Sequence, residues 1–322
     1  MTSAPLDIEL APFEQIDRTV AGIGFVDRRL SDYIQRLQAA LPERPPLSYQ
    51  IGERLKRFKG KQVFLFTGFV VPELYPQGEN DGPLGTIALS RTLERIGLLP
   101  TIWVDPQLLD SAMWLGAELG IEAPIRAIDL DELGRCAHQP AVAIAIEKPG
   151  QNDKNTMHTF DGTAIASGSV PIDCLFHEWA EAEILTIGIG DRGNEIGFGL
   201  LRDEVARLRP ETASCRCGCG GGVVSSTSTQ LFLPAAVSNW GAYGIAAALA
   251  ILANDKALLL DPTEEARLLQ VAAVRGCVDG VQRRSGFGVD GISGRISVAV
   301  VGELQQIAQR AIRTSDDKSA CA

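Results

Sequence analysis

Residues 184–199 read ILTIGIGDRGNEIGFG, in which an apolar run leads directly into a loop rich in glycine and acids. The run Ile184–Ile189 is continuous rather than alternating, which is typical of a strand covered on both faces. Similar runs lie at Val63–Phe66, Thr101–Val104, Val142–Ile146 and Ile296–Val301. Because helical patterns separate these runs, we expect an α/β fold with a mostly parallel, Rossmann-like sheet and helices on both faces.

The helical patterns are clearest in three places. Leu89, Leu93 and Ile96 share one face of a helix that Gly97 would end. Gly244–Ala253 is almost wholly apolar but too short to cross a bilayer, and it predicts a buried helix. A full helical stripe near the end of the chain consists of Leu304, Ile307, Ala308, Ala311 and Ile312.

The chain divides into three predicted parts. Residues 1–59 read as an N-terminal helical extension, whose helix is stopped by Pro42, Pro45 and Pro46. Residues 60–313 hold the alternating strands and helices of the α/β domain. Residues 314–322 are polar and predict a frayed tail.

Composition and charge narrow the function classes. The 322 residues include 30 basic and 40 acidic side chains, a net charge of −10, which argues against a nucleic-acid partner. With 45% hydrophobic residues the chain is globular rather than disordered. No apolar run is long enough to cross a membrane, and the acidic segment 1–17 does not resemble a signal peptide. Seven cysteines cannot all pair with one another, and we expect a cytoplasmic protein.

The loop after Ile189 suggests a ligand. Gly188, Gly190 and Gly193 form a G-x-G-x-x-G pattern, but Asp191 within it would repel a pyrophosphate, and no ribose-binding acid follows at the usual distance. We therefore expect no nucleotide cofactor. Asp191, Asn194 and Glu195 instead offer hard oxygen ligands, which suit Mg²⁺ or another divalent cation, or a substrate ammonium group.

Polar residues also follow the other predicted strands. Residues 78–85, GENDGPLG, contain Glu79, Asp81 and Gly82 before a predicted helix, where Asp81 either caps that helix or belongs to an anion site. Glu147 and Lys148 follow the run that ends at Ile146. Ser238 and Asn239 open the buried helix, whose N–H groups could be satisfied by a substrate carboxylate or by a loop.

Cysteine and histidine patterns give no clear metal site. Cys215, Cys217 and Cys219 are spaced by one residue, whereas paired metal ligands are usually spaced by two to four and need a second pair or histidines. His138, His158 and His177 lie in polar contexts, and we expect them at the surface. The role of the three close cysteines stays open.

Several of these motifs together resemble a known family. They are residues 78–85, Ile146–Gly150, Ile187–Gly199 and Val237–Gly241. In this combination they are similar to the C-terminal module of D-glutamate cyclases, over roughly Gly60 to Arg313. The resemblance implies dehydration of D-glutamate, or a related amino acid, to 5-oxo-D-proline by a hydro-lyase.

We place the polar residues around one pocket at the strand ends. Glu147, Asp191 and Glu195 are the predicted catalytic residues, with Glu147 as the base. Asp81, Gly82, Lys148, Ser238 and Asn239 are the predicted substrate-binding residues, where Lys148 or the Asn239 helix N-terminus would hold a substrate carboxylate. Asp191, Asn194, Glu195 and Glu79 are the predicted ligands of a divalent cation.

Two other functions stay open at this point. The chain could be a non-catalytic binding module for a small anionic metabolite, or a metal-dependent hydrolase of a phosphorylated metabolite. In each case the partner is a small molecule, with no nucleic acid and no membrane, and a homodimer is compatible with the sequence.

Overall fold

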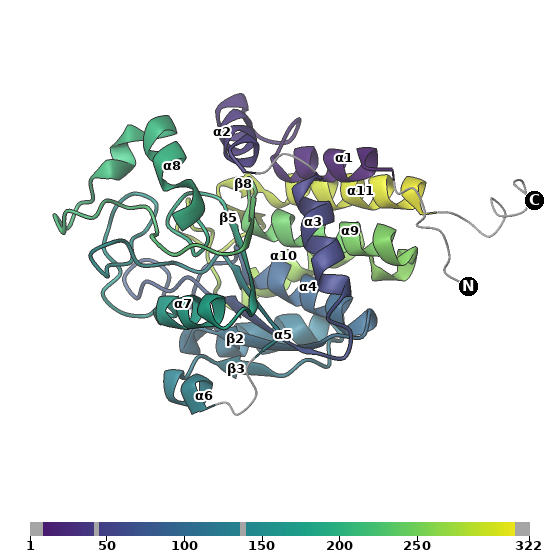
Figure 1. Cartoon of the computed structure of the whole chain (residues 1–322), viewed down its shortest axis with the longest axis horizontal. Coiled ribbons are helices and arrows are strands. Elements are labelled where there is room, and N and C mark those ends of the chain that lie inside the picture. Colours follow the sequence, from purple (N-terminus) through teal and green to yellow (C-terminus); the bar gives the residue numbers. More distant parts are fainter. Residues whose placement is uncertain (1–8, 42–44, 136–139, 313–322) are drawn as a thin grey trace, which may run out of the picture.

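The computed structural model describes residues 9–41, 45–135 and 140–312. Within them, six parallel strands form one sheet in the order β3-β2-β1-β4-β5-β6 (Figure 1). The strands are β1 (Gln62–Thr67), β2 (Leu99–Val104), β3 (Ile125–Ala127), β4 (Val142–Ile146), β5 (Leu185–Gly190) and β6 (Leu231–Pro234). This order confirms the predicted α/β fold. From β1 the chain adds strands β2 and β3 on one side, and then β4, β5 and β6 on the other side, so the strand order reverses between β1 and β4. Open parallel sheets bind their ligands at such a point.

Helices of the described residues surround this sheet. The N-terminal ones are α1 (Ala11–Val20), α2 (Arg28–Ala39) and α3 (Leu47–Lys56). The others are α4 (Pro83–Arg95), α5 (Leu109–Leu119), α6 (Leu130–Arg135), α7 (Asp173–Glu181), α8 (Arg202–Leu208), α9 (Ser238–Ala253), α10 (Pro262–Val274) and α11 (Gly294–Ala311). A small antiparallel pair, β7 (Gly288–Val289) and β8 (Ile292–Ser293), precedes α11.

Alternate side chains of the strands enter two separate cores. On β1, Val63 and Leu65 join the large core formed with α4, α9 and α11, whereas Phe64 and Phe66 join a smaller aromatic core with Phe176 of α7. Both sets of side chains are buried because each face of the sheet is covered. The continuous apolar runs in the sequence therefore reflect two-sided burial.

Helix α9 is the buried helix predicted around Gly244–Ala253. It packs against α1, α3, α4 and α11, and Figure 1 shows these helices gathered on one side of the sheet. Its contact with α4 depends on Gly85, because a Cβ at that position would lie 2.7 Å from the Asn239 Cα. The two helices consequently begin side by side at the C-terminal edge of the sheet.

One predicted strand was wrong. The run Ile296–Val301 lies inside α11, not in the sheet. Its burial follows a helical spacing, since Ser297, Val300, Val301 and Leu304 are buried while Ala299 is exposed. The Ser293 hydroxyl caps this helix by accepting from the Arg295 N–H. The predicted stripe that follows Leu304 simply continues the same helix.

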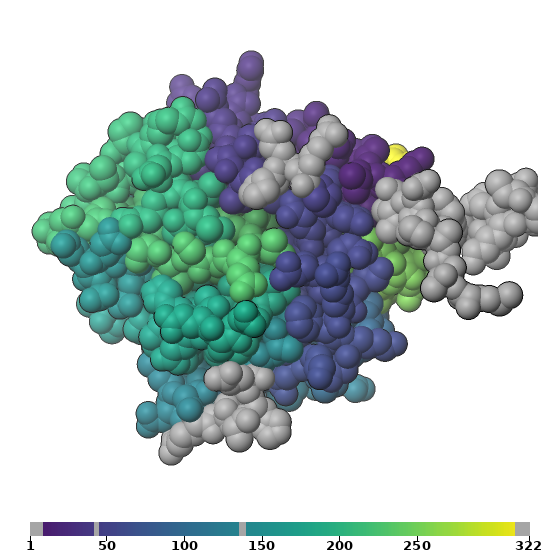
Figure 2. All heavy atoms as spheres, in the orientation of Figure 1, coloured from purple at the N-terminus to yellow at the C-terminus, as the bar shows by residue number. Residues whose placement is uncertain are grey.

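The N-terminal residues form more than the one helix that we predicted. A turn through Gly22 and Gly24, both with positive φ, separates α1 from α2, and Pro46 precedes α3. Phe13, Ile16 and Val20 belong to the same core as the sheet. In Figure 2 the described N-terminal segments, in purple and blue, form a continuous surface with the rest of the molecule. The predicted tail, residues 314–322, lies outside the described residues.

Among the described residues, no helix combines the length and the apolar character that a membrane crossing requires.

Candidate functional site

Six buried carboxylates come together beyond the C-terminal ends of β1, β4 and β5. We call them the carboxylate cluster: Glu79, Asp81, Glu147, Asp191, Glu195 and Asp290. The most exposed of them, Asp290, has only 7% of its surface accessible. Single ligand oxygens of Asp81, Asp191 and Asp290 lie within 4.8 Å of one another, and so do those of Glu147, Asp191 and Glu195. Asp191 therefore stands at the centre of the cluster.

Arg192 supplies positive charge to this centre. Its Nε lies 3.1 Å from Asp191 Oδ2, and its Nη2 lies 3.1 Å from Asp290 Oδ2. However, neither Asp191 oxygen accepts a hydrogen bond of good geometry from any residue that the structure describes, and the same holds for Asn194 Oδ1. Buried acceptors without donors are costly. These oxygens are suited to a cation.

Burial and mutual repulsion shift the pKa values of the acids in the cluster. Desolvation raises the pKa of Glu147 and the pKa of Asp191 well above their ordinary values. The charge of Glu195 raises the pKa of Glu147 further, and the charge of Glu147 raises the pKa of Asp191 further. Desolvation also raises the pKa of Glu79 and of Asp81, and in both cases the Asp290 charge adds to it. Glu79, Asp81, Glu147 and Asp191 therefore hold protons more tightly than ordinary carboxyl groups do, and a bound cation would compete with those protons.

The pKa of Asp290 is shifted in the opposite direction, below its ordinary value. Burial alone would raise its pKa, but the Arg192 guanidinium and hydrogen bonds from neighbouring acids lower it below the ordinary value. The cluster thus combines one carboxyl group whose pKa is lowered with four whose pKa values are raised. Such a division of roles between neighbouring acids is common where proton transfer occurs.

Glu147 has an unusual backbone. Its φ is +47°, a left-handed conformation that a non-glycine residue rarely adopts and that costs about 1–3 kcal/mol. This conformation directs the side chain into the cluster, where Oε2 accepts a 2.5 Å hydrogen bond from Ser238 Oγ. Gly82 allows this placement, because a Cβ there would lie 2.8 Å from Glu147 Cβ.

The starts of α4 and α9 are capped across the site. Asp81 Oδ2 accepts from the Ser238 N–H at 2.9 Å, and Asp81 Oδ1 accepts from the Asn239 N–H at 2.8 Å. In return, Asn239 Oδ1 accepts from the N–H groups of Gly82 at 2.9 Å and Gly85 at 2.7 Å. Asp81 therefore caps α9 rather than the helix that follows it in sequence, and protein groups already satisfy the Ser238 and Asn239 N–H groups.

The loop after β5 is fixed by its own polar side chains. Glu195 Oε2 accepts from the Gly193 N–H at 2.9 Å and Oε1 from the Arg192 N–H at 3.3 Å. Asn194 Nδ2 donates to the His158 carbonyl at 3.0 Å. These bonds hold Glu195 and Asn194 inside the cluster, so the loop is rigid where it meets the acids.

Comparisons with known proteins show the family to which the chain belongs. The model of the family described as "D-glutamate cyclase-like, C-terminal" matches residues 47–305. The chain belongs to this family. A human protein, "D-glutamate cyclase, mitochondrial", is 27% identical over 212 residues, which cover 60% of this chain and 33% of the human protein. The chain thus spans about a third of the length of that relative.

In this D-glutamate cyclase-like chain, Lys148 lies apart from the cluster's cavity. Its Nζ donates to Asp105 Oδ1 at 2.6 Å, and both side chains are fully buried. Burial lowers the pKa of Lys148 and raises that of Asp105, while their attraction opposes both shifts. The Lys148 ammonium is thus engaged in an internal ion pair that anchors β4 to the loop after β2.

Two spaces adjoin the cluster. A small cavity of about 10 Å³, lined among others by Glu79, Glu147 and Asn194, has room for about one water-sized particle or ion. An open groove of about 830 Å³ reaches Asp191 and Asp290 from outside. Its other walls include Arg29, Tyr33, Phe160, Arg192 and Arg209. A small molecule can therefore approach the cluster from the groove, past several guanidinium groups.

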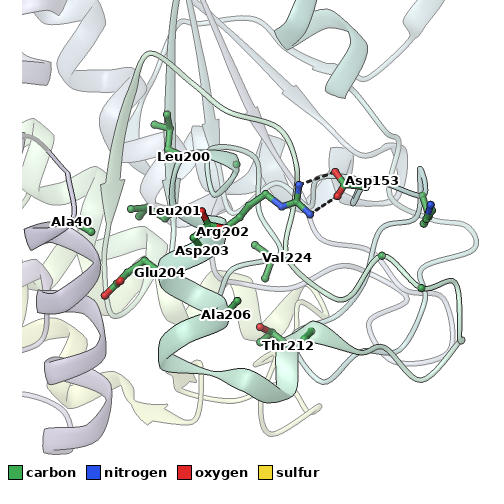
Figure 3. Close-up of a pocket in the computed structure, with 15 residues that line it drawn as sticks. Ala40, Asp153, Leu200, Leu201, Arg202, Asp203, Glu204, Ala206, Thr212 and Val224 are labelled. Carbon is green, nitrogen blue, oxygen red and sulfur yellow. Dashed lines mark hydrogen bonds and ion pairs between the residues drawn. The ribbon is translucent and has the colours of Figure 1, made fainter.

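A third, open pocket of about 880 Å³ lies beside α8 (Figure 3). Its described lining contains none of the predicted site residues, and Arg202 spans it to pair with Asp153. It is larger than the cavity at the cluster, but it lacks convergent buried acids or unpartnered acceptors. We therefore assign the chemistry to the cluster.

Sequence reasoning missed two members of the site, Asp290 and Arg192. Asp290 lies about 100 residues after the glycine loop, in the turn between β7 and β8, and its φ is +54°. The Asp290-Gly291 pair was a turn signal, but nothing in the sequence places this turn against β5. Arg192 stands inside the loop that we quoted, and only the structure shows that it contacts two carboxylates.

Proposed function

We propose that this chain cyclises D-glutamate, or a closely related amino acid, to 5-oxo-D-proline with release of water. The observation that carries the proposal is the buried carboxylate cluster, whose central acid, Asp191, pairs with Arg192 but accepts no hydrogen bond of good geometry from the described residues. Membership in the D-glutamate cyclase-like family supports the choice of reaction. The human relative is named for the same activity but is about three times as long as the matched region.

The reaction joins the α-nitrogen to the γ-carboxyl carbon. The N–Cδ bond forms, one Cδ–O bond of the γ-carboxyl group breaks, and two protons of the α-ammonium leave with that oxygen as water. The reaction therefore needs a base near the nitrogen, an acid near the leaving oxygen, and stabilisation of charge on the γ-carboxyl.

We assign the proton transfers to Glu147. Burial and the neighbouring acids raise the pKa of Glu147, so its carboxylate is a stronger base than that of an ordinary glutamate, which favours accepting a proton from the substrate. Ser238 Oγ fixes one carboxylate oxygen by its 2.5 Å hydrogen bond and leaves the other for the substrate. One residue can thus take the protons from nitrogen and deliver them to the departing oxygen.

We assign cation binding to the oxygens around Asp191. Asp191 and Glu195 fit a divalent ion such as Mg²⁺, because together with Glu147 they offer hard oxygen donors within 4.8 Å of one another. Asp191 and Asn194 also have acceptor atoms without hydrogen bonds of good geometry among the described residues. The predicted ligand Glu79 is in neither group of carboxylate oxygens that lie this close together. When bound, such an ion would polarise the γ-carboxyl group as a Lewis acid. The same oxygens could receive the substrate ammonium.

The groove offers partners for the substrate carboxylates. Arg192 is partly exposed, with 20% of its side chain accessible, and lies at the boundary between the groove and the cluster. Because Lys148 is paired with Asp105, we move the carboxylate-binding role from Lys148 to Arg192. A guanidinium suits this role, since it can bind a carboxylate through two parallel hydrogen bonds.

The direct test is turnover by the pure protein. It is incubated with D-glutamate or L-glutamate, with and without Mg²⁺, Mn²⁺ or Ca²⁺, and 5-oxoproline is followed by chiral mass spectrometry in both directions. We expect D-selective formation of 5-oxo-D-proline. A thermal shift with D-glutamate but no turnover would support the binding-module alternative, and phosphate release from a panel of phosphorylated metabolites would support the hydrolase.

A further inference from the structure

A second cluster of metal-ligating side chains lies outside the carboxylate cluster. His158, Cys215, Cys217 and Cys219 each offer one ligand atom, and these atoms lie within 4.8 Å of one another. We propose that these four residues bind one zinc ion, and this inference does not rest on the proposed cyclase activity.

The distances match a small tetrahedral site. Cys215 Sγ lies 3.2 Å from Cys217 Sγ and 3.4 Å from Cys219 Sγ. His158 Nε2 lies 3.2 Å from Cys217 Sγ and 3.9 Å from Cys219 Sγ. Since Zn–S bonds are about 2.3 Å long, the sulfur atoms of a tetrahedral site lie about 3.8 Å apart. Small shifts of the cysteine side chains therefore reach that geometry.

The four ligands come from two distant segments. His158 is fully buried, whereas Cys217 is exposed and the other two cysteines are partly exposed, so the histidine completes the site from the protein side. Arg216 N–H donates to the Gly162 carbonyl at 2.9 Å, and the Arg216 guanidinium pairs with Asp161. These contacts join the cysteine loop to the segment that carries His158, without any metal.

Donors around the sulfurs favour thiolates. Asn152, which is buried, donates from Nδ2 to Cys219 Sγ at 3.3 Å, and the Gly221 N–H donates to the same sulfur at 3.4 Å. Such hydrogen bonds stabilise charge on a metal-bound sulfur and orient it. Asn152 Nδ2 also donates to the Gly222 carbonyl at 2.7 Å, so its position is fixed.

The glycines of the loop explain why the unusual cysteine spacing works. Gly218, Gly220 and Gly222 all have positive φ, which reverses the chain repeatedly between and after the cysteines. The sulfurs at positions 215, 217 and 219 can therefore meet at one point although only single residues separate them. Sequence reasoning did not favour a metal here because it lacked the fourth ligand, and it placed His158 at the surface, which was wrong.

Zinc is the ion that this donor set fits best. Three cysteines and one histidine in a closed tetrahedron are a common structural zinc set, whereas hard cations such as Mg²⁺ prefer oxygen. The two proposed metal sites thus differ in chemistry: oxygens for the carboxylate cluster, sulfur and nitrogen for this one. The ion would lock together two loops at the left of Figure 1.

The site also adjoins the proposed active site. The His158 carbonyl accepts from Asn194 Nδ2 at 3.0 Å, and the next two residues, Thr159 and Phe160, line the small cavity at the cluster. Five residues before His158 in the chain, Asp153 pairs with Arg202 of α8, as Figure 3 shows. Zinc would therefore fix the wall of the cavity through the backbone of residues 158–160.

The test measures metal content directly. The full chain is purified under reducing conditions without chelator, and zinc is quantified by mass spectrometry. We expect about one zinc ion per chain for the wild type and at least roughly tenfold less for the triple variant C215S/C217S/C219S. Cys174→Ser is the matched control, because Cys174 is exposed and lies outside the cluster. Asp191→Asn should also retain its zinc.

A spectroscopic arm does not depend on a variant that folds. Wild-type protein, stripped of metal and titrated with Co²⁺ in the presence of reductant, should develop the thiolate-to-metal and visible bands of tetrahedral cobalt. Wild-type zinc content equal to that of the triple variant, together with a featureless cobalt titration, would overturn the proposal. Stoichiometric iron and sulfide, or a stable Cys215–Cys217 disulfide in metal-free protein, would overturn it as well.

Discussion

Asp81 accepts hydrogen bonds from the first N–H groups of α9, and Asn239 accepts from those of α4, so that the two residues cap each other's helices. This reciprocal arrangement holds the starts of both helices at the point where the strand order reverses. It also leaves Asp81 at the edge of the carboxylate cluster.

Asn239→Ala should lower the free energy of unfolding by about 2 kcal/mol, because it removes a buried acceptor from the Gly82 and Gly85 N–H groups. Urea denaturation measures the loss. Asp27→Ala is the control, since Asp27 caps α2 in an exposed position and should cost less. Equal losses for the two variants would argue against a special role for the buried cap.

Asp191→Asn should stabilise the cation-free protein by about 1 kcal/mol while it abolishes activity, because Asp191 is buried beside Glu147 and other acids that repel its charge. Thermal denaturation without divalent ions measures the gain. The exposed Asp110→Asn serves as the comparison. A destabilised Asp191→Asn protein would mean that the Arg192 contact, rather than repulsion, dominates at this position.

Glu147→Gln should reduce kcat about 10²- to 10⁴-fold with a smaller change in KM, as expected when a proton-transfer group is replaced by an isosteric amide. Steady-state kinetics with D-glutamate measure this effect. Ser238→Ala should cause a smaller loss and shift the pH profile, since Ser238 only orients the carboxylate. Unchanged kcat in Glu147→Gln would remove Glu147 from the reaction.

Stabilisation by Mg²⁺ should depend on pH. Folding raises the pKa values of Glu79, Asp81, Glu147 and Asp191, so the cation-free folded state binds more protons than the unfolded chain above the ordinary carboxyl pKa, and these groups lower stability as pH rises. A cation must displace those protons, so its affinity rises with pH.

The increase in Tm on adding Mg²⁺ should therefore be larger at about pH 8 than at about pH 6. Differential scanning fluorimetry at the two pH values measures it, with Asp191→Asn as the variant that loses the shift. Mg²⁺ is the suitable probe because it binds weakly to thiolates and leaves the cysteine site untouched. A Mg²⁺ effect that does not change with pH would contradict the assignment of these acids as ligands.

Lys148→Met should lower the free energy of unfolding by about 3–5 kcal/mol, because it leaves Asp105 buried without its cation. The double variant K148M/D105N should recover part of this loss, which a double-mutant cycle by urea denaturation measures. If Lys148→Met is instead as stable as the wild type but binds D-glutamate weakly, the carboxylate-binding role belongs to Lys148 after all.

The sequence predicted those features that depend on local patterns. The runs at β1, β2, β4 and β5 identified the central strands because burial on both faces makes them uniformly apolar. The run Ile296–Val301 misled because β-branched residues also occur in helices when the packing stripe demands them. Short strands such as β3 and β6 carried too little signal.

The site was predictable only where its residues follow strands. Glu147, Asp191 and Glu195 do so, and the structure brings all three within reach of one ion. Asp290 and His158 reach their clusters through long-range packing, which no local pattern encodes. Lys148 also follows a strand, next to Glu147, but its side chain pairs with Asp105 instead of entering the cluster, and the sequence does not determine that direction.

The most direct test of the central claim follows the γ-carboxyl oxygens. The wild-type protein is incubated with Mg²⁺ and D-glutamate that carries ¹⁸O in both γ-carboxyl oxygens. We predict 5-oxo-D-proline that retains one labelled oxygen, with the other recovered in water, and no product from Asp191→Asn, whereas the exposed control Asp110→Asn reacts as the wild type does. Absence of labelled 5-oxo-D-proline from the wild type, with every divalent ion tried, would contradict the account.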